Sequence, residues 1–273
     1  ILSDGSQLHD EPQHVAQGQM TIEQLNLLKI PFRIIDKEVD EIEPILSELV
    51  DAAISKQCPV ALVVRKSSFS SFKLSANQQD SLLTREESIK AIIAELPQNV
   101  PVVSTTGMTS RELFELRKKS GEGNEKDFLT VGGMGHASAI ATGIALSKGD
   151  QKVLCLDGDG ALLMHMGILT NTADCRNLMH VVINNGVHDS VGGQPTKANS
   201  LDLGAIAKAC GYQYVYRAND ADEIRRAIKS MLQGSGSSFL EIQCRQGARP
   251  DLGRPDRTPA ESKRDFMQFL ANL

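Results

Sequence analysis

Residues 152–160 read KVLCLDGDG, and residues 178–186 read LMHVVINNG. Each stretch begins with apolar residues typical of a buried strand and ends in the small polar residues typical of a turn. The segment between them, residues 161–177, is long enough for one helical crossover connection. Because neighbouring parallel strands end at the same edge of a sheet, we expect the GDG and NNG motifs to lie close together there.

Strand-like runs alternate with helical patterns along most of the chain. The further runs lie at residues 60–64, 100–106, 127–133, 212–217 and 239–244. Helix-start patterns stand between them at Thr84-x-x-Glu87, Thr109-x-x-Glu112, Asp220 and Thr258-Pro259-x-Glu261, and Gly234 marks a helix end. This alternation predicts an α/β fold, a doubly wound parallel sheet, over residues 84–273.

The first 74 residues show fewer signals of secondary structure. Residues 1–74 contain one helical pattern, at 36–57, and one clear strand, at 60–64, which is too little for a complete α/β domain. We therefore expect them to be the C-terminal part of a second α/β domain, joined through a polar linker at residues 75–83. The chain opens on ILSDG without a methionine, as if it began inside a domain.

Composition excludes several function classes. Lys and Arg number 29 against 34 Asp and Glu, so the net charge of -5 gives no electrostatic basis for binding nucleic acid. No basic run or apolar run of about 18 residues indicates a membrane partner. The five cysteines form no CxxC pair, and the start has no signal-peptide pattern. We expect reduced thiols and a cytoplasmic protein.

The two motifs carry groups that suit a metal-bound diphosphate. Asp159 and the amide oxygen of Asn185 offer hard oxygen ligands to Mg²⁺, and a backbone carbonyl just beyond, at Val187, offers a third. The contacts to phosphate are expected from the glycine loop and the helix start at Gly158, Gly160 and Ala161. Either motif alone is more often a simple turn.

The GDG motif, some two dozen residues and then NN resemble the thiamine-diphosphate enzymes. In that family a bulky apolar residue, here Met134, holds the cofactor in a bent shape, and the carbonyl two residues earlier, here Gly132, accepts a hydrogen bond from its aminopyrimidine. The loop that lies near the diphosphate corresponds to Thr106, Gly107 and Thr109. The resemblance thus implies thiamine diphosphate and Mg²⁺ as cofactors, and a homodimer or higher homo-oligomer.

Longer runs narrow the resemblance. STTGMTSRELFELR, GGMGHASAIATGIAL, NNGVHDSVGGQPT and ARPDLGRP look like the phosphonopyruvate decarboxylase family, across essentially the whole chain, and the sulfopyruvate decarboxylases are the nearest relatives. The implied reaction is decarboxylation of a small anionic 2-oxo acid, for which the cofactor supplies an electron sink that no side chain provides. Phosphonopyruvate is the expected substrate and sulfopyruvate the alternative.

Four residues are candidates for contact with the substrate. His188 and Asp189 follow the metal loop and could transfer protons, although His188 could simply orient the loop. Arg249 and Arg254 stand among proline and glycine, where a guanidinium suits a phosphonate, although loop arginines are often just solvent-exposed.

One residue that the resemblance implies, an activating glutamate, cannot be assigned to a position in this sequence. In the family, a glutamate early in the partner domain of a neighbouring subunit activates the cofactor. Glu11 and Glu23 match by residue type only, so we expect this glutamate upstream and the chain to be truncated. A non-catalytic cofactor-binding fragment or subunit is therefore an alternative. A nucleotide-binding α/β protein fits less well, because GxxxxGK[ST] is absent and GGMGHA does not complete GxGxxG.

Overall fold

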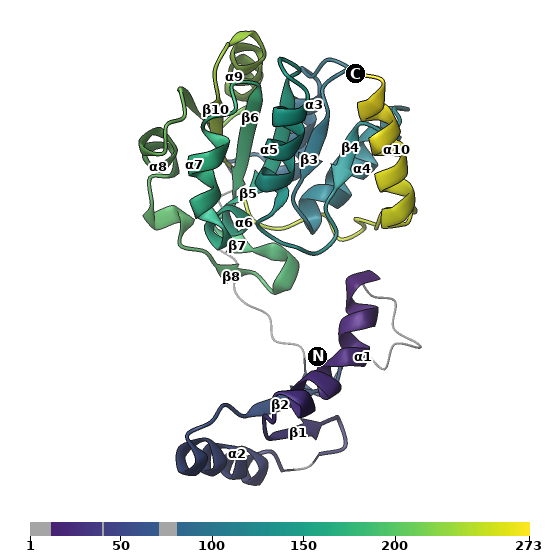
Figure 1. Ribbon diagram of the computed structural model, residues 1–273, viewed down its shortest axis with the longest axis vertical. Helices are drawn as coiled ribbons and strands as arrows, with labels where there is room; N and C mark the ends of the chain where they lie inside the picture. Colours follow the sequence, from purple (N-terminus) through teal and green to yellow (C-terminus); the bar gives the residue numbers. More distant parts are fainter. Residues whose placement is uncertain (1–11, 40, 71–80) are drawn as a thin grey trace. The chain divides into compact units, whose positions relative to one another are not determined.

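The computed structural model describes residues 12–39, 41–70 and 81–273. The chain divides into two compact units, Ile1–Leu74 and Ser75–Leu273. Each unit is described by itself, and Figure 1 traces its elements along the sequence. Glu11 and residues 75–80 of the predicted linker lie outside the described residues.

The first unit is a small β-α-β arrangement that follows a helix. Its elements are α1 (Pro12–Leu27), β1 (Phe32–Ile35), α2 (Glu43–Lys56) and β2 (Ala61–Val64). The strands pair in parallel, with Phe32 opposite Ala61. The sequence analysis missed β1, a four-residue strand too short to show a period. It also began the helix at residue 36, whereas α2 begins at Glu43, with Pro44 in its first turn, the helical position that tolerates proline best.

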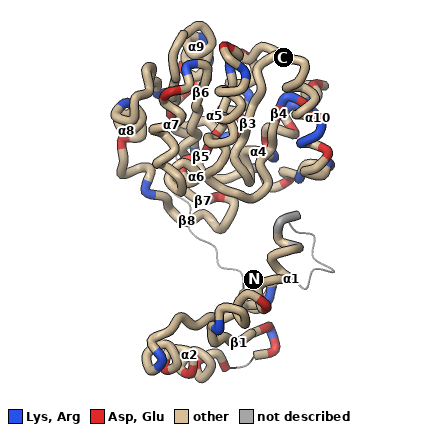
Figure 2. Tube along the Cα trace, viewed as in Figure 1, with Lys and Arg blue, Asp and Glu red and all other residues tan. Residues whose placement is uncertain are grey.

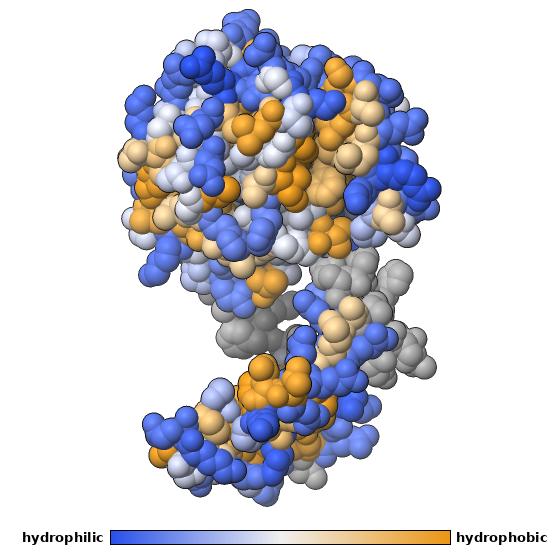
Figure 3. Space-filling view, viewed as in Figure 1, coloured by the Kyte–Doolittle hydropathy of each residue, from blue (hydrophilic) through white to orange (hydrophobic). Residues whose placement is uncertain are grey.

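The first unit leaves much apolar surface exposed. Ile35, Leu49 and Val63 are buried, but Val50 and Ile54 on α2 are more than half exposed. Figure 3 shows apolar surface on both units. Two strands and one covering helix therefore bury only part of the apolar side chains in this unit.

The second unit is built on a six-stranded sheet in the order β4-β3-β5-β6-β10-β9. Every pairing in it is parallel. The strands are β3 (Val102–Ser104), β4 (Asp127–Leu129), β5 (Val153–Gly158), β6 (Leu178–Asn184), β9 (Tyr214–Ala218) and β10 (Ser238–Gln243). The predicted α/β fold with a parallel sheet is confirmed.

Helices cover both faces of this sheet (Figure 1). They are α3 (Arg85–Ile93), α4 (Met108–Lys119), α5 (Ala137–Ser147), α6 (Asp159–Met164), α7 (Leu169–Thr172), α8 (Leu203–Ala209), α9 (Ala221–Gln233) and α10 (Pro259–Ala271). One core cluster joins α3, α4 and α9 to the sheet. Two others join it to α6, α7 and α8 and to α5. The buried strands are apolar almost throughout because both faces are covered.

Local signals placed most helix starts correctly. Thr84 and Glu87 form the predicted capping box, and so do Thr258 and Glu261. Asp220 caps α9, which ends at Gly234. The predicted box at Thr109-x-x-Glu112 is wrong, because α4 already begins at Met108 and the Glu112 side chain turns into the protein, where it is 1% exposed.

The strand order creates a crevice at one edge of the sheet. From β3 the chain passes to β4 on one side, and from β5 it passes to β6 on the other, although β3 and β5 are neighbours. Ligands of open α/β sheets bind at the carboxyl ends of strands where the order reverses in this way. The GDG motif ends β5, so it lies at this switch point.

Acidic and basic residues alternate along the traces of both units (Figure 2). Among the helices of the described residues, none combines the length and the apolar character needed to cross a lipid bilayer.

Candidate functional site

A cavity opens at the carboxyl ends of β3, β5 and β6. Its walls come from the loop after β3, from the junction of β5 and α6, from the segment after β6 and from the start of α3. The lining residues that the sequence analysis named are Thr106, Thr109, Met134, Gly158, Asp159, Gly160, Ala161, Asn185, Val187, His188 and Asp189. Most of the predicted site residues therefore meet in one place.

Two further predicted residues border the cavity. The Gly132 N–H donates a hydrogen bond to the Thr106 hydroxyl at 3.1 Å, which ties the loop after β4 to the loop after β3. Gly107 caps α4 with a φ of 91°, and a Cβ built there would lie 3.1 Å from Cβ of Ser190. Glycine is required at this position by both the backbone conformation and the close approach.

Asp159 and Asn185 converge on this cavity. Asp159 is the first residue of α6 and only 2% exposed. Its carboxylate accepts hydrogen bonds from the backbone N–H groups of Gly160 and Asn185 and from the Thr196 hydroxyl. Burial raises the pKa of Asp159, and these hydrogen bonds oppose the rise. The Asp159 carboxylate thus lies beside the backbone of Asn185, and both residues line the cavity.

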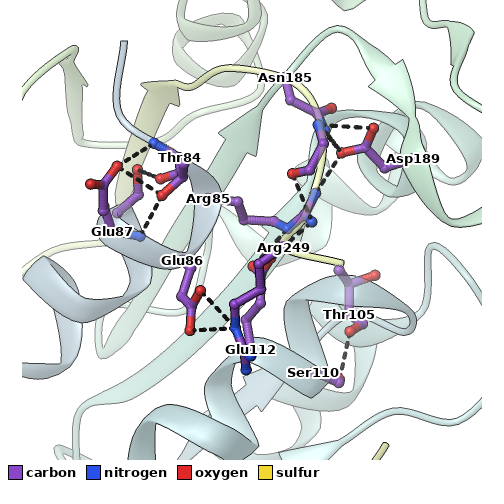
Figure 4. A network of polar contacts seen from close by, with 12 residues as sticks. Thr84, Arg85, Glu86, Glu87, Thr105, Ser110, Glu112, Asn185, Asp189 and Arg249 are labelled. Atoms are coloured by element: carbon purple, nitrogen blue, oxygen red, sulfur yellow. Dashed lines mark hydrogen bonds and ion pairs between the residues drawn. The ribbon is translucent and has the colours of Figure 1, made fainter. Parts of the chain in front are cut away.

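The side-chain amide of Asn185 is held at both ends. Its Nδ2 donates to Oδ2 of Asp189 at 2.6 Å, and its Oδ1 accepts from the Val187 N–H at 3.2 Å. Asp189 also accepts from Arg85 Nη1 at 2.9 Å and from the Gly247 N–H at 3.0 Å (Figure 4). The Asp189 carboxylate is therefore engaged by three donors.

Arg85 is a cavity residue that sequence reasoning missed. It is 5% exposed, and its guanidinium binds both carboxylate oxygens of Glu112, at 2.8 and 3.0 Å. Burial alone would lower the pKa of Arg85, but pairing with Glu112 and Asp189 raises it overall. Because cations are unfavourable in the first turn of a helix, an arginine directly after the Thr84 cap was the available signal.

Met134 and His188 close over Gly160. A Cβ built at Gly160 would lie 2.5 Å from two atoms of the His188 ring and 3.4 Å from Cε of Met134. Gly135, beside Met134, has a φ of 89°, and a Cβ there would come within 2.9 Å of the Ala161 carbonyl. The predicted glycine, methionine and histidine are thus packed together.

Thr105 also lines the cavity and was not among the predicted site residues. Its Oγ1 is buried and has no hydrogen-bond partner among the described residues. A buried hydroxyl without a partner destabilises a protein unless a bound group satisfies it. The free hydroxyl, the paired oxygen ligands and the glycine-walled space fit a metal-bound diphosphate.

The predicted arginines lie elsewhere. Arg249 is bound to Glu86 at 3.1 Å, to Asp251 at 2.9 Å and to Glu115. Neither it nor Arg254 is among the residues that line the cavity. Glu23 is an exposed residue of α1, in the first unit. The two arginines are therefore not lining residues of this cavity.

A family model and several known proteins match this chain. The thiamine pyrophosphate enzyme C-terminal TPP binding domain matches residues 105–242. The phosphonopyruvate decarboxylase of Streptomyces viridochromogenes is 32% identical over 279 residues, which cover 96% of this chain and 69% of that protein. The sulfopyruvate decarboxylase subunit beta of Methanococcus maripaludis is 32% identical over 190 residues, covering 69% of this chain and 98% of that subunit.

Solved structures agree on the fold. The benzoylformate decarboxylase of Polynucleobacter necessarius superimposes with a TM-score of 0.53 at 18% identity, over 66% of this chain and 36% of that one. A thiamin diphosphate-dependent enzyme from Mycobacterium smegmatis gives 0.51 at 22% identity, over 61% and 32%. At such identities the likeness concerns the fold alone.

Proposed function

The chain belongs to the thiamine pyrophosphate enzymes, and on that premise we propose that it decarboxylates phosphonopyruvate to phosphonoacetaldehyde and CO₂. Two phosphonopyruvate decarboxylases from Streptomyces are 32% and 31% identical to it over 96% and 95% of its length. The observation that carries the proposal is the contact between Asp159 and Asn185 at the switch-point cavity, within the matched residues.

Thiamine diphosphate, when bound, supplies the electron sink that decarboxylation needs. We propose that Asp159, the amide oxygen of Asn185 and the Val187 carbonyl would hold a Mg²⁺ ion, which would neutralise the diphosphate charge. The loop and helix-start residues proposed to bind the diphosphate are Thr105, Thr106, Gly107, Thr109, Gly158, Gly160 and Ala161. We propose that Gly132 and Met134 contact the part of the cofactor that carries the aminopyrimidine, since Met134 lies beside Gly160 in the cavity.

His188 is the proposed proton-transfer residue. Its ring lies over Gly160 and lines the cavity, and its two ring nitrogens can donate and accept hydrogen bonds there. Asp189 was proposed for the same task, but its carboxylate is engaged by Arg85, Asn185 and Gly247.

Binding of the substrate anion by Arg249 and Arg254 remains a proposal. For Arg249 it requires the phosphonate to replace one of the carboxylates that now bind the guanidinium. Replacing Arg254 by Gln is expected to raise KM for phosphonopyruvate by about 10- to 100-fold through loss of a charge-assisted hydrogen bond. Steady-state kinetics with pyruvate provide the comparison, and an equal rise for both acids contradicts the assignment.

The proposal also concerns the oligomeric state. The sulfopyruvate decarboxylase relative is named as a beta subunit, which indicates that this kind of chain functions with other subunits. We propose a homodimer or higher homo-oligomer.

A side-by-side decarboxylation assay tests the function. With thiamine diphosphate and Mg²⁺ present, CO₂ release and aldehyde formation should be fastest with phosphonopyruvate. A clear preference for sulfopyruvate would identify the alternative enzyme. Cofactor binding without CO₂ release from either acid would identify a non-catalytic cofactor-binding chain.

A further inference from the structure

Four segments far apart in the sequence meet behind the proposed metal loop. Arg85 at the start of α3 binds Glu112 of α4, Asp189 after the loop, and through Asp189 both Asn185 and Gly247 (Figure 4). Neither Arg85 nor Glu112 needs to touch a ligand for this arrangement to exist. The network ends on the one side-chain amide that the proposed function assigns to the metal.

We propose that Arg85 is a positioning residue that acts through Asp189 to keep the amide oxygen of Asn185 available to the metal. The inference rests on the proposed function, because it needs Asn185 to be a ligand. It goes further by assigning positioning tasks to Arg85 and Asp189, which the sequence pattern did not predict.

The amide of asparagine has two nearly isosteric orientations, but only its oxygen can bind Mg²⁺. Asp189 is an acceptor, so it fixes the Nδ2 end of Asn185 at 2.6 Å. The Val187 N–H, at 3.2 Å from Oδ1, favours the same orientation from the other end. A rotated amide would face Asp189 with its oxygen and the metal with its NH₂ group, and both contacts would be lost.

Asp189 itself needs support, because its side chain is mostly buried beside another carboxylate, Glu112. The guanidinium of Arg85 lies between the two, with Nη1 on Asp189 and Nε and Nη2 on Glu112. Without this cation the two carboxylates would repel each other across a poorly solvated space. Asp189 would then turn away, and the amide of Asn185 would lose its anchor.

The Gly247 N–H extends the network to the segment that follows β10. This N–H lies 3.2 and 3.0 Å from the two oxygens of Asp189. The planar guanidinium of Arg85 donates several hydrogen bonds at once, so it can hold these segments together. A lysine cannot reproduce this geometry.

The test compares Arg85→Gln with Arg117→Gln in the full chain. Arg117 is a matched control, since it is 1% exposed, binds the buried Asp127 at 3.1 Å and is not among the cavity residues. The readout is thiamine diphosphate binding, by calorimetry, as a function of Mg²⁺ concentration. Arg85→Gln should raise the Mg²⁺ concentration for half-saturation by about 10- to 100-fold, as expected for a residue behind a metal ligand. Arg117→Gln should lower Tm and leave that concentration unchanged.

A double-mutant cycle tests the route through Asp189. If Arg85 acts through Asp189, Arg85→Gln combined with Asp189→Ala should raise the Mg²⁺ requirement no further than the larger single effect. Additive effects, or the same Mg²⁺ requirement in Arg85→Gln and Arg117→Gln, would overturn the inference. If Arg85→Gln does not fold, Arg85→Lys decides: it keeps the charge and should still raise the Mg²⁺ requirement.

The two proposals fail in different ways. A wild-type chain without Mg²⁺-dependent binding of thiamine diphosphate refutes the metal site and the proposed function. A wild-type chain that binds normally, together with an Arg85→Gln variant of unchanged Mg²⁺ requirement, refutes only the positioning role.

Discussion

Replacing Asp159 by asparagine is expected to remove Mg²⁺-dependent binding of thiamine diphosphate and to slow decarboxylation by about 1,000-fold or more. The substitution is nearly isosteric, so the hydrogen bond from Thr196 can persist, but the anionic ligand is gone. The carboxylate is the charged ligand of a metal that neutralises a diphosphate. Its loss should weaken the binding free energy by several kcal/mol, and about 4 kcal/mol already corresponds to a 1,000-fold effect.

The position of Asp159 explains why the effect should be so large. The side chain is 2% exposed at the tip of β5, where it contacts the Asn185 backbone. Bulk water has little access and cannot replace the lost carboxylate oxygen. Calorimetry with increasing Mg²⁺ measures the binding, and CO₂ release measures the reaction.

Asp220→Asn is the matched control for this substitution. Asp220 caps α9 by accepting from the Glu223 N–H at 2.8 Å, and asparagine caps a helix equally well. Binding and turnover should be unchanged in this variant. If Asp159→Asn still bound the cofactor at wild-type Mg²⁺ concentrations, Asp159 would not be a metal ligand.

The second large effect is expected from Gly160→Ala. In most helices this change is favourable by about 1 kcal/mol. Here the added methyl group would lie 2.5 Å from the His188 ring and close to Met134, so the ring must move. The methyl group and the displaced ring reduce the space for the cofactor, so cofactor affinity and turnover should fall by about 10- to 100-fold, equivalent to about 1.4–2.8 kcal/mol.

Because His188 is only partly buried, its ring can swing aside and the fold should survive. Tm should therefore change little while calorimetry and turnover show the loss. Gly143→Ala provides the comparison: Gly143 lies in α5, and a Cβ there meets nothing within 4 Å. Equal effects of the two alanines would show that the contact with His188 is unimportant.

The architecture of the second unit could be predicted because its signals are local and repeated. The strands β5 and β6 are apolar over most of their length, so their burial on both faces is visible in the sequence. The caps at Thr84 and Thr258 act within three residues, and both formed as expected. The convergence of Asp159 with Asn185 followed from strand order alone, since parallel strands share a carboxyl edge.

The first unit shows where local signals become too weak. β1 has only four residues, so its sequence could not be distinguished from that of a loop. Its existence depends on pairing with β2, which lies 29 positions further along the chain in register. The assignment of residues 1–74 to the C-terminal part of a second α/β domain, and of residues 75–83 to a linker, stays a prediction.

By itself the sequence determined the parallel α/β sheet, the edge at which the motifs meet and the family to which the chain belongs. Only the tertiary structure decided that Glu112 binds Arg85 instead of capping a helix, that Asp189 anchors Asn185, and that Arg249 is surrounded by carboxylates. Helix and strand signals arise from neighbours within a few residues. The ion pairs of Arg85 join residues 27 and 104 positions apart, so their partners are set by how the helices pack on the sheet.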